Sequence, residues 1–154
     1  MQIKTTRFGP IEVPEADVLS FAQGLIGMED CRRWIILADA QNPALAWLQS
    51  AERADLALAV VSPRRFVPDY QVRVSGRDVA GLGLGGADGN APSGEAKDAQ
   101  VVVVVNKTPE GLAVNLKAPI VVCLATKSGR QIIAKDDHAV QYVLGATVPF
   151  RRSA

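Results

Sequence analysis

Cysteine, histidine, aromatic residues and net charge are all scarce in this sequence. Its 154 residues include two cysteines and one histidine, aromatic residues make up 5%, and the formal net charge is +1. Two cysteines without close spacing supply neither a disulfide framework nor a zinc site. A near-neutral charge argues against nucleic-acid binding driven by bulk electrostatics, which requires a basic face. We expect Cys123, inside an apolar run, to be buried, and Cys31, beside Asp30 and Arg32, to be exposed.

Long hydrophobic segments are also missing. No run of about 18 apolar residues occurs, so no segment is expected to span a membrane. The opening Met1-Gln2-Ile3-Lys4-Thr5 lacks the apolar region of a secretory signal, which predicts a cytoplasmic protein. The length and the hydrophobic content of 48% fit one domain over residues 1–154, with its core in about residues 1–135.

Short apolar runs punctuated by turn residues fill most of the chain. Val101 to Val105 is an unbroken valine run, which we expect to be a strand buried on both faces. Lys127-Ser128-Gly129 indicates a hairpin turn. The sequence therefore predicts an all-β (mainly β) fold, a small antiparallel β-barrel-like domain with few short helical turns. The other strands are expected at residues 1–7, 11–13, 17–21, 34–37, 56–61, 70–75, 112–117, 120–124 and 131–134.

Two segments do not fit this pattern simply. Residues 44–57 are rich in good helix formers, so they read either as a helix or as a strand, turn and strand, and the β-rich context favours the second. Residues 81–98 are rich in glycine and poor in large apolar side chains, which predicts a flexible surface loop. Their Gly81-Leu82-Gly83-Leu84-Gly85-Gly86 has the letters of a dinucleotide-binding loop, but the residues after it do not open a helix. Residues 148–154 are expected to be a loosely held tail.

Catalytic and metal-binding patterns are weak. Asp136-Asp137-His138 holds the single histidine, and a solvated acidic turn explains it better than a metal site or a hydrolase pair. We therefore expect no catalytic residue, no metal and no cofactor, and predict that the protein is not an enzyme. A hydrolase that uses His138 is a distant alternative.

Two stretches are the candidates for partner binding. Prolines stiffen residues 62–70, whose aromatic side chains either face a partner or close over one end of the barrel. In residues 115–122 a strand is interrupted at Pro119, so that Leu116 and Ile120 face the core and an edge or bulge lies between them. We expect Tyr70→Ala to weaken partner binding with little change in melting temperature. The candidate partner-binding residues are Arg65, Phe66, Asp69, Tyr70, Asn115, Lys117 and Pro119.

A third loop, Gly24-Leu25-Ile26-Gly27-Met28, is unusually apolar. Its apolar side chains either cap the core or form a contact patch, and capping is favoured.

Six segments follow one another along the chain: Thr5-Thr6-Arg7-Phe8-Gly9-Pro10-Ile11-Glu12-Val13, Asp17-Val18-Leu19-Ser20-Phe21-Ala22-Gln23-Gly24-Leu25-Ile26-Gly27-Met28, Trp47-Leu48-Gln49-Ser50, the proline loop from Ser62-Pro63 to Asp69-Tyr70, Asn115-Leu116-Lys117-Ala118-Pro119-Ile120-Val121, and Gly129-Arg130-Gln131-Ile132-Ile133. In this order they resemble the FliW family of flagellar assembly factors. The resemblance runs from the N-terminus to about Ala134. Ile26 and Met28 stand where the family usually has Pro and Phe, and residues 81–98 look longer than the family segment.

The resemblance implies a function through protein–protein contact. Proteins of this family bind CsrA, a small dimeric RNA-binding repressor, and relieve its repression of flagellin mRNA; they also bind flagellin. It further implies a monomer when unbound, with no direct nucleic-acid or membrane contact. The alternative from the residues alone is a β-barrel module that binds a small ligand or RNA, with basic and aromatic side chains gathered on one barrel face.

Overall fold

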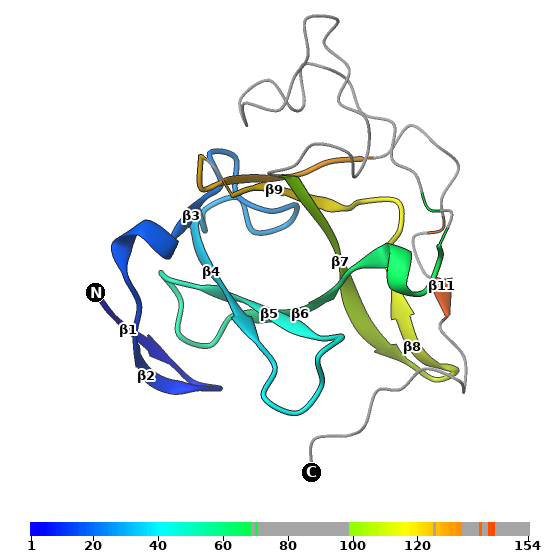
Figure 1. Cartoon of the computed structure of the whole chain (residues 1–154), viewed down its shortest axis with the longest axis horizontal. Helices are drawn as coiled ribbons and strands as arrows, with labels where there is room; N and C mark the ends of the chain where they lie inside the picture. The colour runs from blue at the N-terminus through cyan, green and yellow to red at the C-terminus, as the bar shows by residue number, and fades with distance from the viewer. Residues whose placement is uncertain (69, 71–98, 125, 134–138, 140–141, 144–154) are drawn as a thin grey trace, which may run out of the picture.

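The computed structural model describes residues 1–68, 70, 99–124, 126–133, 139 and 142–143, and it contains a closed barrel of seven strands (Figure 1). Each strand pairs with the next in the order β7-β6-β5-β4-β3-β10-β9, and a β9–β7 pairing closes the ring. All these pairs are antiparallel except β10–β3. The all-β barrel expected from the sequence is confirmed. The barrel strands are β3 (Leu19–Ser20), β4 (Arg33–Ala38), β5 (Ala46–Ser50), β6 (Ala57–Val61), β7 (Ala99–Thr108), β9 (Ile120–Cys123) and β10 (Ser128–Gln131).

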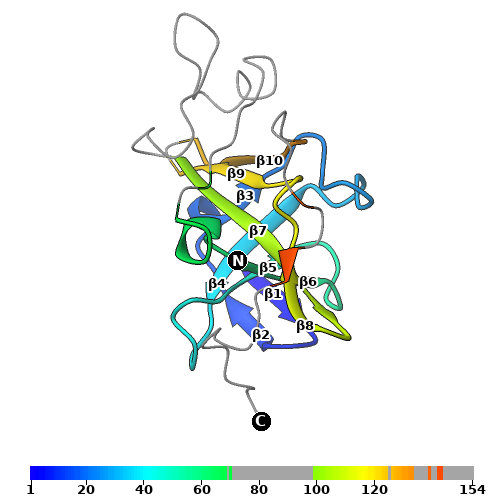
Figure 2. The same ribbon diagram turned by 90° about the vertical axis from the view of Figure 1, so that its right-hand side faces the viewer.

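The long strand β7 crosses the molecule and has three partners (Figure 2). Its first half pairs with β9 and its last part with β8 (Gly111–Val114), which in turn pairs with β11 (Tyr142–Val143). Val102 pairs with Ile120 and Val105 with Val114, so β7 advances three residues while its partner advances six. Residues 115–119 therefore loop out between β8 and β9 as a bulge, as the proline in this stretch predicted.

The barrel interior is filled by alternate side chains from all around the ring. Trp34, Leu48 and Val60 on β4, β5 and β6 meet Ile120 and Val122 on β9, and all five are fully buried. This alternation of inward and outward side chains follows from the two-residue period of a strand. Cys123 is buried, as expected; Cys31 is buried too, so the prediction of an exposed Cys31 is wrong. Its backbone carbonyl accepts a hydrogen bond from the Trp34 indole, which holds this segment against the core.

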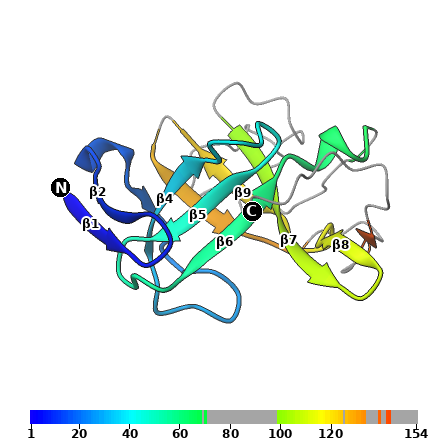
Figure 3. The ribbon, with the colours of Figure 1, turned by 90° about the horizontal axis from the view of Figure 1, so that it is seen from below.

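Two smaller clusters lie on the outside of the barrel. The β1 (Gln2–Thr5) and β2 (Gly9–Glu12) hairpin covers Ile35 on the outer face of β4, and Figure 3 shows this hairpin beside β4 and β5. On the other side, the 3-10 turn η2 (Pro63–Arg65) and the residues after it cover the outer faces of β6, β7 and β9, around Val61 and Val103. A second 3-10 turn, η1 (Glu15–Asp17), precedes β3.

Residues 44–57, which the sequence left open between helix and hairpin, form strands. β5 and β6 pair antiparallel from Ala46↔Val60 to Gln49↔Ala57, around a turn at residues 51–55. Burial of Leu48 inside the barrel outweighs the helix propensity of the segment. In the described residues, the only helical elements are the turns η1 and η2.

Two details of the sequence prediction need correction. The turn between β9 and β10 ends at Lys127, whose φ is 52°, and Ser128 and Gly129 already belong to β10. The valine run in β7 is half-buried except at Val103, so the expected burial of the whole run on both faces is wrong. The expected strand at residues 70–75, the loop at 81–98, His138 and the tail at 148–154 lie outside the described residues, apart from Tyr70.

In the part of the chain that the structure describes, no helix is both long and apolar enough to cross a membrane.

Candidate interaction surface

The bulge at residues 115–119 is held by side-chain hydrogen bonds at nearly every residue. The Asn115 Oδ1 accepts hydrogen bonds from the backbone N–H groups of Lys117 and Ala118, at 3.1 Å each. These hydrogen bonds satisfy backbone N–H groups that do not pair with a neighbouring strand. The Gln131 Nε2 donates to the Ala118 carbonyl, and the Ile132 N–H donates to the Pro119 carbonyl, each at 3.0 Å. The bulge is therefore a fixed shape on the barrel wall.

The loop after β6 is tied to this bulge. The Tyr70 hydroxyl donates a hydrogen bond to the Leu116 carbonyl at 2.6 Å, and both residues are buried in the same outer cluster. The Arg64 Nε donates to the Tyr70 carbonyl at 3.0 Å, which closes the loop on itself. The two stretches that the sequence proposed separately for partner binding thus meet through Tyr70, and we name residues 62–68, Tyr70 and 115–119 together the loop–bulge surface.

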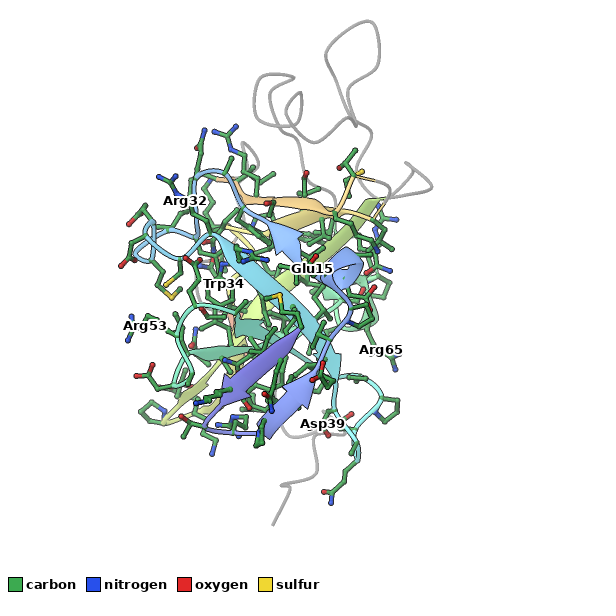
Figure 4. All side chains as sticks on the ribbon, turned by 90° about the vertical axis from the view of Figure 1, so that its left-hand side faces the viewer. Glu15, Arg32, Trp34, Asp39, Arg53 and Arg65 are labelled. Carbon is green, nitrogen blue, oxygen red and sulfur yellow. The ribbon has the colours of Figure 1, made fainter. Side chains whose placement is uncertain are left out.

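The candidate residues occupy different depths of this surface. Arg65 is exposed, and Figure 4 shows its side chain pointing outward. Phe66 is partly buried against the outer cluster, and Asn115 and Lys117 are half-buried. Asp69 lies outside the described residues.

Two of the candidates are buried and need correction. Tyr70 is 3% exposed, and Pro119 is buried as well. Tyr70 therefore folds back onto the barrel, as the second reading of its loop had it, but it packs on the barrel wall and not over the barrel end. Its contribution to a partner contact would be to hold neighbouring residues in place.

Gln131 connects the loop–bulge surface to the apolar loop at residues 24–28. Its Oε1 accepts a hydrogen bond from the Ile26 N–H at 2.9 Å, while its Nε2 binds the Ala118 carbonyl. In that loop Leu25 is 1% exposed and caps the core, as favoured from the sequence, whereas Ile26 is 51% exposed. Capping of the core by Leu25 is confirmed, and Ile26 lies at the surface.

A second surface, which sequence reasoning missed, lies on the outer face of β5. The guanidinium of Arg7 lies over the Trp47 ring, 4.1 Å from its centroid, and the Phe8 ring meets Trp47 edge-on with centroids 6.1 Å apart. The Trp47 Nε1 donates to the Asp39 Oδ1 at 3.1 Å. We name Arg7, Phe8, Asp39 and Trp47 the Arg7–Trp47 patch. An outward tryptophan in a strand of the β5–β6 hairpin was its only sequence signal.

Asp39 is the charged anchor of this patch. The Trp47 indole N–H holds the pKa of the Asp39 carboxyl below its usual value; partial burial opposes this, and the backbone N–H groups of Gln41 and Asn42 add to it. Asp39 therefore keeps its negative charge, and with it the indole orientation, at neutral pH.

These features define a closed β-barrel that presents shaped loops and an aromatic patch, an architecture suited to binding macromolecules. A sequence model of the family described as "FliW protein" matches residues 2–144. The chain belongs to the FliW family, flagellar assembly factors that act without catalysis.

Curated relatives resemble the chain over most of its length. It is 34% identical to the "Flagellar assembly factor FliW" of Bdellovibrio bacteriovorus over 90% of this chain and 75% of that protein. It is also 34% identical to the protein of the same name in Natranaerobius thermophilus, over 86% of this chain and 84% of that protein.

A solved structure has the same fold. It is described as "Crystal structure of the flagellar assembly factor FliW", and it superposes with a TM-score of 0.80 at 23% identity, covering 94% of this chain and 96% of that one.

Proposed function

We propose that this protein binds the translational repressor CsrA, relieves its repression of flagellin mRNA, and also binds flagellin, acting in the cytoplasm by protein–protein contact. The observation that carries the proposal is the family match over residues 2–144. The two activities are those that the sequence resemblance implied for FliW proteins. A small barrel with fixed loops fits this role, because preorganised contacts lose little entropy on binding.

The loop–bulge surface is the proposed contact region. It offers an exposed arginine, a half-buried phenylalanine and a half-buried lysine on backbone that hydrogen bonds hold in place, at Arg65, Phe66 and Lys117. Arginine and aromatic residues of this kind carry much of the binding free energy in protein interfaces.

The test is binding of the purified chain to CsrA and to flagellin from the same organism, measured by calorimetry. We expect dissociation constants at or below about 1 μM, as for a specific complex. The double variant Arg65→Ala/Lys117→Ala should bind one of the two partners at least about tenfold more weakly. Arg32→Ala is the matched control, since Arg32 is exposed and lies on the opposite side of the view in Figure 4. Absence of binding to both partners at micromolar concentration would refute the proposal.

A second candidate function is binding of single-stranded RNA, which the stacked Arg7 and Trp47 favour. Asp39 on the same indole and a net charge of only +1 oppose it, because phosphate binding requires several cations along a groove. A gel shift with single-stranded RNA separates the two candidates. A shift at low micromolar protein, lost at higher salt, would support the RNA candidate.

A further inference from the structure

The Arg7–Trp47 patch is built on a rigid hairpin tip. The Thr5 hydroxyl donates to the Gly9 carbonyl and accepts from the Phe8 N–H, both at 2.8 Å, across the turn between β1 and β2. The Thr6 N–H donates to the Ala54 carbonyl at 2.8 Å, which fastens the tip to the β5–β6 turn. Arg7 and Phe8 are thus held against Trp47 by the backbone as well as by their own ring contacts.

Trp47 is fixed from the other side by Asp39. The carboxylate binds the indole N–H through Oδ1, while its Oδ2 accepts hydrogen bonds from the backbone N–H groups of Gln41 and Asn42. The indole therefore has one preferred orientation. Trp47 is half-buried, so part of the ring remains at the surface beside Arg7.

Arg7 is left with unused hydrogen-bond donors. Its side chain is exposed, and within the described residues it makes the contact with Trp47 but no ion pair or hydrogen bond. A guanidinium that stacks on a ring through its face keeps the N–H groups along its edge directed outward. Those groups match a carboxylate in a two-bond geometry, and the contact with Trp47 reduces the entropy cost of ordering the arginine on binding.

We propose that the Arg7–Trp47 patch binds a carboxylate-bearing segment of flagellin, with Arg7 pairing the carboxylate and the surfaces of Trp47 and Phe8 packing on apolar atoms beside it. This inference rests on the proposed function, in which flagellin and CsrA are the partners. Charge decides between them. An RNA-binding repressor presents cations to phosphates, and such a surface would repel Arg7.

The arrangement also favours a single carboxylate over a chain of phosphates. Asp39 sits on the same indole as Arg7, and it would repel a second anion placed nearby. A single carboxylate requires only Arg7, whereas consecutive phosphates would bring further negative charge toward Asp39.

Two tryptophans make the test direct. Trp47 lies in the patch, and Trp34 is 0% exposed inside the barrel, with its indole N–H bonded to the Cys31 carbonyl. In the full chain labelled with ¹⁵N-tryptophan, titration with purified flagellin should shift or broaden the Trp47 indole resonance and leave that of Trp34 nearly unchanged. Titration with CsrA and with a single-stranded RNA oligonucleotide provides the comparison.

Substitutions complete the experiment. We expect Arg7→Ala to weaken flagellin binding about tenfold or more, and Arg7→Lys to weaken it less, because lysine keeps the charge but loses the planar group. Arg53→Ala is the matched control. Arg53 is also exposed, but it lies in the β5–β6 turn and pairs with Asp55, so its loss should change affinity less than about twofold.

The outcomes separate the two proposals. If the Arg7→Ala variant keeps its melting temperature and binds flagellin with unchanged affinity, the patch proposal is overturned and the proposed function stands. A Trp47 shift caused by CsrA or by RNA in place of flagellin also overturns it. If the unaltered chain binds neither flagellin nor CsrA, the patch proposal and the proposed function are both overturned.

Discussion

At the scale of single residues, Tyr70 shows how one hydroxyl can join two distant segments. It reaches across 46 positions of sequence to the Leu116 carbonyl, and its ring lies in the outer cluster with Val61 and Val103. Both the hydrogen bond and the ring contribute to stability, and two substitutions separate them.

We expect Tyr70→Phe to cost about 1–3 kcal/mol, because the buried Leu116 carbonyl loses its hydroxyl donor. Tyr70→Ala should cost about 3–5 kcal/mol, since the ring is lost as well. For a domain of this size, each kcal/mol lowers the melting temperature by about 2–4 °C, so the near-constant melting temperature expected from the sequence no longer holds. Equal melting temperatures for the Phe and Tyr proteins would show that the hydrogen bond contributes nothing.

Asp39 gives a residue-scale prediction of pH dependence. A carboxyl whose pKa is lower in the folded state stabilises the protein above its unfolded pKa, about 3.9, and this contribution is lost as the pH falls through the lowered folded value. We expect the Trp47 indole resonance to move in that acidic window and to stay constant between about pH 5 and 8. Asp39→Asn should abolish the transition. A Trp47 transition that persists in Asp39→Asn would assign the titration to another group.

At the scale of elements, the local sequence pattern predicted most of the strands but few of the residues at which they begin and end. The pairing of residues 46–49 with 56–61 and the bulge before Ile120 followed from apolar runs, turn residues and the proline at 119. Burial of Cys31 was not predicted and burial of Tyr70 was left open, because each belongs to a cluster whose other members are far away in sequence, such as Ile120 for Cys31 and Leu116 for Tyr70. The Arg7–Trp47 patch was missed for the same reason: its members are distributed over residues 7–47, and only the fold brings them together.

Gly129 is an element-scale case in which a strand packs closely on the residue that follows its neighbouring strand: Ser128 of β10 pairs with Ser20 of β3, and Phe21 comes next. A β-carbon at Gly129 would lie 2.2 Å from the Cζ of Phe21, and because Phe21 is fully buried its ring would have to shift within a packed core. We expect Gly129→Ala to destabilise the protein by about 1–3 kcal/mol through overpacking, measured by chemical denaturation.

A double-mutant cycle checks the cause. In a Phe21→Leu background the ring edge is gone, so Gly129→Ala should cost less than in the unaltered chain, with a coupling of about 0.5–3 kcal/mol. Gly27→Ala is a control, because no atom lies within 4 Å of its β-carbon position and its φ of +85° brings backbone strain alone. If the free-energy costs of Gly129→Ala and Phe21→Leu were strictly additive, the destabilisation by Gly129→Ala would not come from contact with the Phe21 ring.

At the scale of the whole molecule, closure of the barrel was beyond the reach of local pattern. It depends on β7 pairing with β9 and on the parallel contact of β3 with β10, and β3 and β10 lie more than 100 positions apart in the sequence. Hydrophobic periodicity predicts which face of a strand is buried but not which strand lies beside it. The family resemblance supplied that information for the sequence, and the solved structure with a TM-score of 0.80 has the same fold.

The β3–β10 contact is also where we expect the barrel to open first. It has a single registered pair, Ser20↔Ser128, whereas β4–β5 has five pairs and β9–β10 has four. Local opening of a short contact exposes little apolar surface, so it requires less free energy than global unfolding. Native-state hydrogen exchange should therefore show the Ser20 amide, which donates to the Lys127 carbonyl at 2.8 Å, exchanging at least about tenfold faster than the slowest amides of the β4–β5 ladder.

Gly129→Ala, which disturbs the Phe21 contact beside this pair, should raise the exchange rate of the Ser20 amide more than it raises the rates in β4 and β5. If Ser20 exchanged only with global unfolding, at the rate of the β4–β5 amides, the barrel would open as one cooperative unit and this contact would be as strong as the rest of the ring.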